Sequence, residues 1–270
     1  MTLPPRVRLA LASFTALVLA AIYLPLLVVL VSSVNPDRTF SWPPRGVTAQ
    51  WWQRAWSNAG AREALWTSAK AGLGATVLAL VLGTMAAFAV GRYRFFGREA
   101  VSFLVVLPIA LPGIVTGIAL NAAFRTTLEP FGIGLGLLTV VIGHATFCIV
   151  VVYNNVLARL RRMGGSLEEA SADLGADTFQ TFLHVTLPSV RSALLAGGLL
   201  AFALSFDEII VTTFTAGPGV QTLPIWIFSN IARPNQAPIV MVVAAVLIVF
   251  AILPVWLAQR LSGNTTGGRL

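Results

Sequence analysis

Long apolar runs alternate with short, arginine-bearing polar segments along the whole chain. A transmembrane helix needs about 20 predominantly apolar residues, and the sequence offers runs of that length repeatedly. We predict six transmembrane segments, at about 9–34, 71–90, 100–124, 132–157, 189–214 and 237–259. The first run is longer than the roughly 7–15 apolar residues of a signal-peptide core, so we interpret it as a retained span. The pattern predicts an all-α polytopic membrane protein, with residues 1–270 forming a single transmembrane domain.

The composition agrees with this class. Hydrophobic residues make up 57% of the chain and charged residues only 10%, whereas a soluble domain carries about 25% charged residues. A soluble protein of 270 residues could not cover its surface with so few charges. The net charge of +8 raises the question of nucleic acid. Because the basic residues are scattered between apolar runs, we expect a lipid bilayer and no nucleic acid as the partner.

The basic residues also predict an orientation. Six spans place both termini on one side of the membrane. Eleven of the 18 Lys and Arg residues then share the side of the termini, and seven fall on the other side. Because cytoplasmic loops carry the excess of basic residues, we predict that both termini face the cytoplasm.

The predicted outer loop over residues 35–70 is rich in tryptophan. It holds five of the seven tryptophans of the chain, namely Trp42, Trp51, Trp52, Trp56 and Trp66. Indole side chains favour the headgroup region of a bilayer. Thr48 can cap a short helix on which Trp52 and Trp56 share a face. We predict an interfacial helix on the outer leaflet in preference to a ligand-binding role.

The predicted inner loop over residues 159–188 carries signals for two short helices. Ser166 followed by Glu169 has the spacing of a capping box, and Gly175 can end the first helix in a left-handed conformation. Asp177 and Gln180 form a second capping box. The loop is therefore predicted to be a cytoplasmic helix–turn–helix and not a flexible connector.

The second of these helices is amphipathic. Phe179, Phe182 and Leu183 fall on one face, and Pro188 can occupy the first turn of the next span. Such a face either lies in a groove of a partner protein or packs on the helix ends of its own chain. The spacing alone leaves both interpretations open.

The residues of this loop resemble the EAA loop of permease subunits of binding-protein-dependent ABC importers, which have the MetI-like fold. Glu169-Ala170-Ser171, Gly175 and the segment 185–188 (Val-Thr-Leu-Pro) match its spacing, with Ser171 in place of the second alanine and Val185 in place of isoleucine. The loop lies between the fourth and fifth predicted spans, where that family has it. The resemblance implies an ATPase-coupling loop that includes Ser166, Glu169, Ala170, Ser171, Gly175, Phe179, Phe182, Leu187 and Pro188.

A wider resemblance covers nearly the whole chain. The segments 32–35 (SSVN), 51–52 (WW), 83–84 (GT), 205–211 (SFDEIIV), 216–219 (AGPG) and 222–225 (TLPI) are similar to the smaller permease of spermidine/putrescine-type importers. This implies a bacterial inner-membrane subunit that moves polyamines into the cytoplasm by alternating access. Its implied partners are a second permease in a heterodimer, two copies of a cytoplasmic ABC ATPase and a periplasmic solute-binding protein. Related permeases carry opines, other amines or iron, so the substrate stays open.

Several features argue against catalysis by this chain. Lys70 is the only lysine and stands between two alanines, so no Walker A phosphate loop is present. ATP and magnesium are therefore expected on the partner ATPases, and we predict no cofactor here. His144 and His184 lack metal-ligand spacing, so we predict no metal site and expect His144 to be a hydrogen-bonded interior residue. Cys148 lies in an apolar run and is expected to be inert.

Two other functional classes fit the sequence less well than a permease. A self-sufficient secondary transporter would need an internal repeat and broken helices with ion ligands, and we find no convincing repeat. An intramembrane enzyme would need a nucleophile with a base or a metal cluster within the spans, which the sequence does not offer.

Charged residues within the apolar layer are costly and often functional. Asp207 and Glu208 interrupt the fifth predicted span, towards its outer end. We predict that Asp207, supported by Glu208, attracts a cationic substrate, and we place Ser205 and Asn121 on the same candidate path. The alternatives are a carboxylate that caps a helix or pairs with an arginine of the partner permease, and an Asn121 that joins helices.

Overall fold

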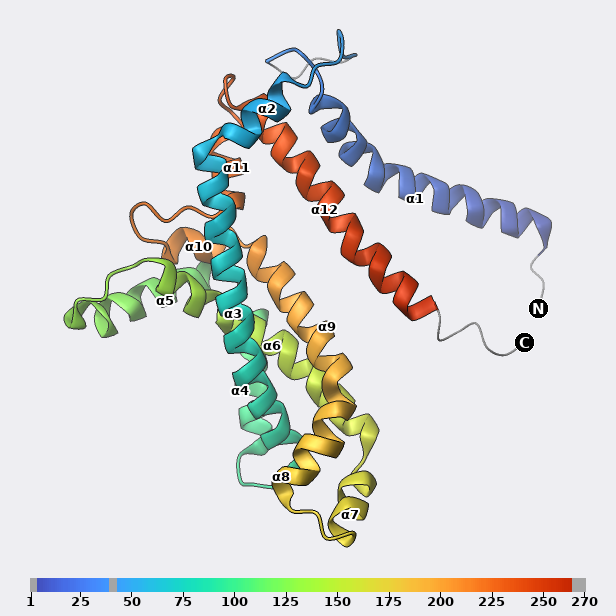
Figure 1. Ribbon diagram of the computed structural model, residues 1–270, viewed down its shortest axis with the longest axis vertical. Helices are drawn as coiled ribbons and strands as arrows, with labels where there is room; N and C mark the ends of the chain where they lie inside the picture. The colour runs from blue at the N-terminus through green and yellow to red at the C-terminus, as the bar shows by residue number, and fades with distance from the viewer. Residues whose placement is uncertain (1–3, 39–42, 264–270) are drawn as a thin grey trace. The chain divides into compact units, whose positions relative to one another are not determined.

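The computed structural model describes residues 4–38 and 43–263, with side chains described as far as residue 251. Trp42 of the tryptophan-rich loop lies outside these residues. The regular structure in the described ranges is helical (Figure 1). Its elements are α1 Pro5–Ser32, α2 Gln50–Ser57, α3 Ala59–Arg92, α4 Arg98–Ala110, α5 Gly113–Thr127, η1 Glu129–Phe131, α6 Leu137–Met163, α7 Ser166–Asp173, α8 Thr178–Thr181, η2 Phe182–Thr186, α9 Leu187–Phe206, α10 Ile210–Thr215, α11 Leu223–Asn230 and α12 Ala237–Gly263.

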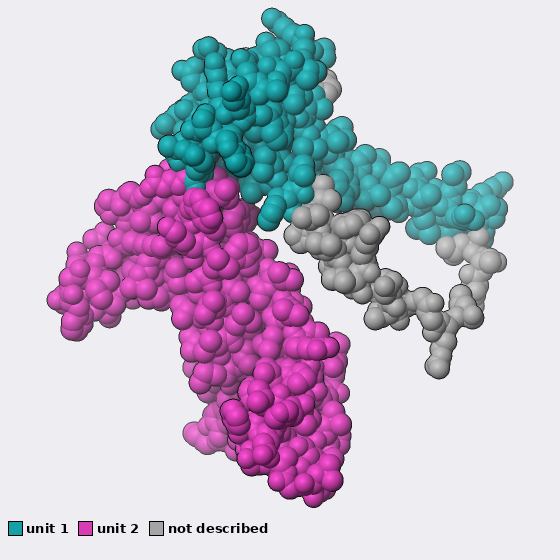
Figure 2. Space-filling model, viewed as in Figure 1, with its two compact units in different colours: residues 1–62, 227–270 teal, residues 63–226 magenta. Residues whose placement is uncertain are grey.

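The chain divides into two compact units (Figure 2). One comprises residues 1–62 and 227–270, and the other comprises residues 63–226. In the first unit, α12 packs against α1 and α2. The Trp51 indole N–H donates to the Asn35 carbonyl oxygen at 2.9 Å, and Trp51 is only 3% exposed. Trp51 therefore holds α2 against the end of α1.

The short predicted helix of the tryptophan-rich loop is present as α2. Its N-cap is Ala49, one residue after the predicted Thr48, although the Thr48 hydroxyl accepts a hydrogen bond from the Gln50 N–H. Trp52 and Trp56 are both exposed on α2. Exposed indole rings on a short helix are typical of a membrane interface.

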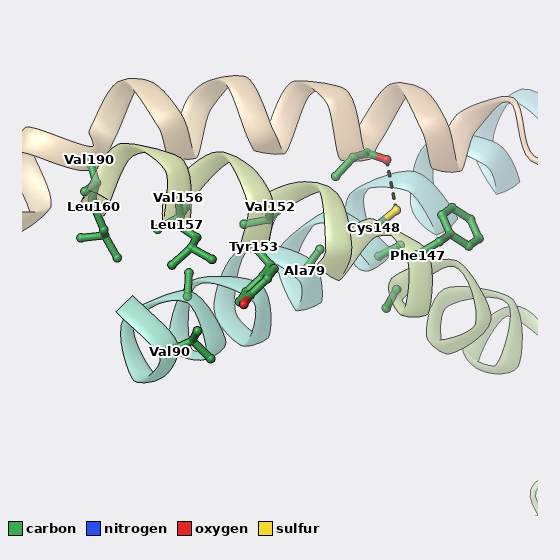
Figure 3. Close-up of a cluster of buried hydrophobic side chains, with 14 of the residues drawn as sticks. Ala79, Val90, Phe147, Cys148, Val152, Tyr153, Val156, Leu157, Leu160 and Val190 are labelled. Carbon is green, nitrogen blue, oxygen red and sulfur yellow. Dashed lines mark hydrogen bonds between the residues drawn. The ribbon is translucent and has the colours of Figure 1, made fainter. Parts of the chain in front are cut away.

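The second unit is built on three long helices, α3, α6 and α9. Its apolar core is formed by side chains such as Ala79 and Val90 of α3, Tyr153 and Leu160 of α6 and Val190 of α9 (Figure 3). Cys148 is buried in this core, and its thiol lies 3.3 Å from a carbonyl oxygen of α9.

Glycines let these helices approach closely. A Cβ at Gly83 of α3 would lie 2.9 Å from the Ile149 carbonyl oxygen of α6. A Cβ at Gly197 of α9 would lie 3.2 Å from the Cα of Val152. Close backbone contacts of this kind are typical of helix packing in membranes, where the lipid supplies no hydrophobic drive for association.

The predicted third span is two helices and not one bent helix. The chain leaves α4 after Ala110 and begins α5 at Gly113, and the two helices are bent by 108° relative to each other. Leu111 is extended, as expected for a residue that precedes a proline. Pro112 also lacks the amide that a continuous helix would need. The chain therefore turns sharply within the predicted span over 100–124.

The membrane-spanning helices can be counted within the described residues. Four segments are long and apolar enough to cross a membrane, namely Pro5–Ser32, Ala59–Arg92, Leu137–Met163 and Thr178–Phe206. The α4–α5 pair satisfies the same criteria when its two helices are taken together. The α12 helix is apolar over Ala237–Ala251, the part with described side chains. The chain is thus an all-helical protein with four or five clear membrane-spanning segments.

The predicted fifth span is interrupted. A continuous helical stretch runs from Thr178 to Phe206, and the chain then leaves the helix at Asp207 before α10 begins at Ile210. The two acidic residues therefore stand at a break between helices instead of inside one. The loop that carries α7 and α8 and this break lie at opposite ends of α9 (Figure 1).

Candidate functional site

The first helix of the inner loop begins differently from the prediction. The N-cap of α7 is Gly165, and Ser166 is the first helical residue without a capping side-chain hydrogen bond. The predicted Ser166–Glu169 capping box is therefore wrong. Glycine is an acceptable N-cap residue, so the helix starts one residue earlier than the hydroxyl would have placed it. Glu169 is exposed in the first turn.

The turn at Gly175 agrees with the prediction. Gly175 has φ of +85°, a conformation that glycine adopts without steric cost. The Gly175 N–H donates to the Ala172 carbonyl oxygen at 2.9 Å, and the Ala176 N–H donates to the Ser171 carbonyl oxygen at 3.1 Å. The Ser171 hydroxyl also lies 3.0 Å from the Thr181 hydroxyl. This turn therefore fixes the two short helices against each other.

The second capping box is present. The Asp177 carboxylate accepts from the Gln180 N–H at 2.8 Å, and the Gln180 side chain accepts from the Asp177 N–H at 3.0 Å. From this cap the helix continues through the π-helical turn η2 into α9. Pro188 lies in the first turn of α9, as predicted. The loop is an ordered helix–turn–helix.

An ion pair that no local pattern indicates anchors this loop to the long helices. Glu168 of α7 lies 2.9 Å from the Arg92 guanidinium at the end of α3. The same carboxylate accepts from the Thr186 hydroxyl at 2.9 Å, and Arg92 donates to the Leu160 carbonyl oxygen at 3.3 Å. The network joins α3, α6, α7 and η2. Glu168 and Arg92 are 76 positions apart, so helical periodicity could not pair them.

The two phenylalanines of the loop have different surroundings. The Phe182 ring contacts the edge of the Phe88 ring of α3, with centroids 5.6 Å apart. Phe179 is 70% exposed and Leu174 is 90% exposed. Among the other predicted coupling residues, Leu187 is half-buried, whereas Ala170 and Pro188 are exposed. The loop thus packs on its own chain through one side and leaves apolar side chains open on the other.

At the opposite end of α9, Asp207 is exposed and follows the last helical residue. Glu208 has a local structural contact, because its carboxylate accepts from the Val211 N–H at 2.8 Å in the first turn of α10. Glu208 thus caps a helix, which was the predicted alternative to attraction of a cationic substrate. Asp207 is the carboxylate that the break presents outward.

The remaining candidates join helices. The Asn121 side-chain amide of α5 donates to the Phe214 carbonyl oxygen of α10 and accepts from Arg125 at 3.1 Å. Ser205 is buried, with its hydroxyl 2.7 Å from Nδ1 of His144. The other His144 nitrogen, Nε2, lies 2.8 Å from the Thr212 hydroxyl. His144 is fully buried, which confirms that it is a hydrogen-bonded interior residue.

Glycine also shapes the contact between α5 and α10. A Cβ at Gly117 of α5 would lie 2.6 Å from the Phe214 ring. The small residue therefore lets the bent arm α5 lie directly on α10, next to the break at Asp207.

These observations together define a helical membrane protein in which an ordered loop joins two long apolar helices. Comparison with known families places it more narrowly. Residues 79–266 match the family described as the binding-protein-dependent transport system inner membrane component. The match covers more than half of the chain, and the chain belongs to this family. It is a multi-pass permease subunit of an ABC importer in the inner membrane.

Curated relatives are similar over most of their length. The putrescine transport system permease protein PotI of Escherichia coli K12 is 33% identical over 84% of this chain and 80% of the relative. The spermidine/putrescine transport system permease protein PotC of Haemophilus influenzae is 32% identical over 93% of this chain and 95% of the relative. The PotC protein of Escherichia coli K12 is 30% identical over 97% of both chains.

A solved structure supports the fold. A chain of a bacterial ABC transporter involved in the import of the acidic polysaccharide alginate aligns with a TM-score of 0.67. The alignment covers 98% of this chain and 99% of that chain at 17% identity. At this identity the likeness bears on the fold alone.

Proposed function

We propose that this permease imports polyamines such as spermidine and putrescine. The observation that carries the proposal is its identity of 30–33%, over most of the chain, to permeases named for these substrates. The exposed carboxylate of Asp207 at the break between α9 and α10 suits a cationic substrate. In this proposal Ser205, Glu208 and Asn121 shape the path around Asp207.

The proposed assembly contains a second permease, two copies of a cytoplasmic ABC ATPase and a periplasmic solute-binding protein. Six membrane segments, with the α4–α5 pair counted as one and α12 as the last, would place both termini in the cytoplasm. The coupling loop over 159–188 then lies on the same side as the ATPases. Exposed apolar side chains on an ordered loop, Leu174 and Phe179 among them, support a protein partner at this surface.

The proposed mechanism transfers motion along a continuous helix. Closure of the ATP-bound ATPases displaces the loop, and the helix over Thr178–Phe206 carries the displacement to the break at Asp207. ATP drives the change because it binds the two conformations with different affinity. Magnesium and ATP are held by the partner subunits, so the permease supplies the path and the linkage.

An uptake measurement tests the substrate. The permease is purified with its co-expressed ATPase and second permease, reconstituted in liposomes, and supplied with the binding protein and ATP. We expect labelled spermidine or putrescine to accumulate, and an excess of unlabelled polyamine to compete while an uncharged amino acid does not. ATP-dependent uptake of another solute, without uptake of either polyamine, would contradict the proposal.

Replacement of Gly175 by Asp tests the docking surface. A side chain at φ of +85° strains the turn by about 1–2 kcal/mol, and the added carboxylate stands beside the exposed Leu174. We expect less ATPase to co-purify and uptake to fall about tenfold, since 1.4 kcal/mol corresponds to a factor of ten.

The matched control is Gly97→Asp. Gly97 also has a positive φ, +83°, with open space around the position of its Cβ, and it lies outside the coupling loop. We expect this variant to keep its ATPase. Normal co-purification and normal uptake with Gly175→Asp would show that the loop does not dock there.

A further inference from the structure

A buried histidine beside the break at Asp207 has no part in the proposed transport mechanism so far. His144 is fully buried, and its ring bridges Ser205 near the end of α9 and Thr212 of α10. Both partners are buried as well. One side chain of α6 therefore holds both helices that flank the break.

The hydrogen bonds of Thr212 favour one tautomer of the His144 ring. The Thr212 hydroxyl donates its single hydrogen to the Glu208 carbonyl oxygen at 2.9 Å, so towards His144 this oxygen accepts. We therefore assign the ring proton to Nε2, which donates to Thr212. Nδ1 is then an acceptor, and the Ser205 hydroxyl donates to it. The chain of donors runs from Ser205 through His144 and Thr212 to the backbone of the break.

This chain fixes the residues on both sides of Asp207. Ser205 precedes it by two positions, and the carbonyl group of Glu208 follows it directly. The Glu208 carboxylate is also held, by the Val211 N–H at 2.8 Å. Asp207 alone in this stretch projects an exposed charged side chain.

The far end of α10 is held separately. The Thr139 hydroxyl of α6 donates to the Thr215 carbonyl oxygen at 2.7 Å, and Asn121 donates to the Phe214 carbonyl oxygen. These bonds keep α10 against α6 and α5 even without His144. Loss of the histidine would therefore release the break while leaving α10 attached.

We propose that His144 is a positioning residue that holds Asp207 in the geometry needed for substrate passage. This rests on the proposed role of Asp207 in the substrate path. His144 itself does not face the substrate in this scheme, because it is buried and both ring nitrogens are occupied. It acts through the backbone on either side of the carboxylate.

The test is a double-mutant cycle in the reconstituted complex, with the initial uptake rate as the readout. The variants are His144→Leu, Asp207→Asn and the combination of both, each normalised to folded, ATPase-associated protein. We expect each single change to lower uptake about tenfold, and the combination to be no worse than Asp207→Asn, because residues acting as one unit are not additive. Losses that multiply to about a hundredfold would overturn the proposal.

The outcome separates this inference from the function on which it rests. Normal uptake with Asp207→Asn would remove Asp207 from the path, and the positioning role with it. Multiplying losses would leave Asp207 in the path and remove only the link to His144. A purely structural role for His144 predicts the second result.

Three further variants keep the test decisive if His144→Leu does not accumulate. Thr212→Val removes the same chain of hydrogen bonds with little change of shape, and we expect the same loss and the same non-additivity with Asp207→Asn. Thr213→Val is the matched control, since Thr213 is exposed and its hydroxyl donates to the carbonyl oxygen of Ile209, the N-cap of α10, at 2.7 Å and not to the His144 chain. His144→Gln, which keeps a donor near Thr212, is expected to restore part of the uptake. Equal losses with both threonine variants would contradict the proposal.

Discussion

Replacement of Gly217 by Ala is expected to cause a large loss of stability. The Cβ of an alanine there would lie 1.8 Å from the Leu135 carbonyl oxygen and 3.1 Å from the Gly136 nitrogen. Both neighbours are backbone atoms, so no side chain can rotate away. We expect a cost of roughly 3 kcal/mol or more, measured as a lower melting temperature and a smaller folded fraction in detergent.

The expected damage includes the start of α6. Gly136 is the N-cap of α6, and its N–H donates to the Thr139 hydroxyl at 2.8 Å. The same hydroxyl donates to the Thr215 carbonyl oxygen of α10. Displacing Gly136 would therefore disturb the contact between these helices. Gly134→Ala is the control, because a Cβ at Gly134 meets nothing within 4 Å; equal stability of the two variants would contradict the packing argument.

Replacement of Glu168 by Gln is expected to uncouple ATP hydrolysis from transport. The change leaves the Arg92 guanidinium without its carboxylate partner. Both side chains are largely shielded from solvent, since Arg92 is 18% exposed and Glu168 is 23% exposed. A hydrogen bond to a charged group contributes about 1.5–3 kcal/mol. We expect the coupling loop to loosen from α3, so that ATP is hydrolysed with much less uptake per ATP.

Exchanging the two charged residues of the ion pair provides the decisive comparison of uptake. Arg92→Glu combined with Glu168→Arg restores an opposite pair, and uptake should recover well above that of either single charge reversal. Glu99→Gln is the matched control, because Glu99 is exposed at the start of α4, outside the coupling loop. An uptake-to-ATPase ratio in Glu168→Gln equal to that of Glu99→Gln would show that the ion pair does not contribute to coupling.

Short sequence motifs predicted the structure of the coupling loop correctly where the motif depends only on neighbouring residues. The Asp177–Gln180 box and the left-handed Gly175 need only neighbouring residues, and both are present. The Ser166 cap failed because Gly165 competes for the same position at almost equal free energy. A choice between two adjacent caps depends on the path of the preceding chain, which the spacing does not encode.

The end of α9 at Asp207 was less predictable. Apolar residues stand on both sides of Asp207 and Glu208, so hydropathy predicted one span where the structure has a helix, a break and α10. The break is stabilised by contacts from elsewhere in the sequence, above all His144, which lies 61 positions from Ser205. The Arg92–Glu168 pair was missed for the same reason. Hydropathy identified the class of protein, and long-range polar contacts decided where its helices stop.

The continuous stretch from the Asp177 cap to Phe206 makes α9 a lever. Its 20 residues span about 30 Å with Gly197 near the middle, so a tilt of about 10° about Gly197 moves each end by about 2.5 Å. The fulcrum lies where Gly197 brings α9 against the backbone of α6. A tilt of α9 at the end that carries α7 and α8 would therefore move the break at Asp207 by a similar distance, without any helix having to unwind.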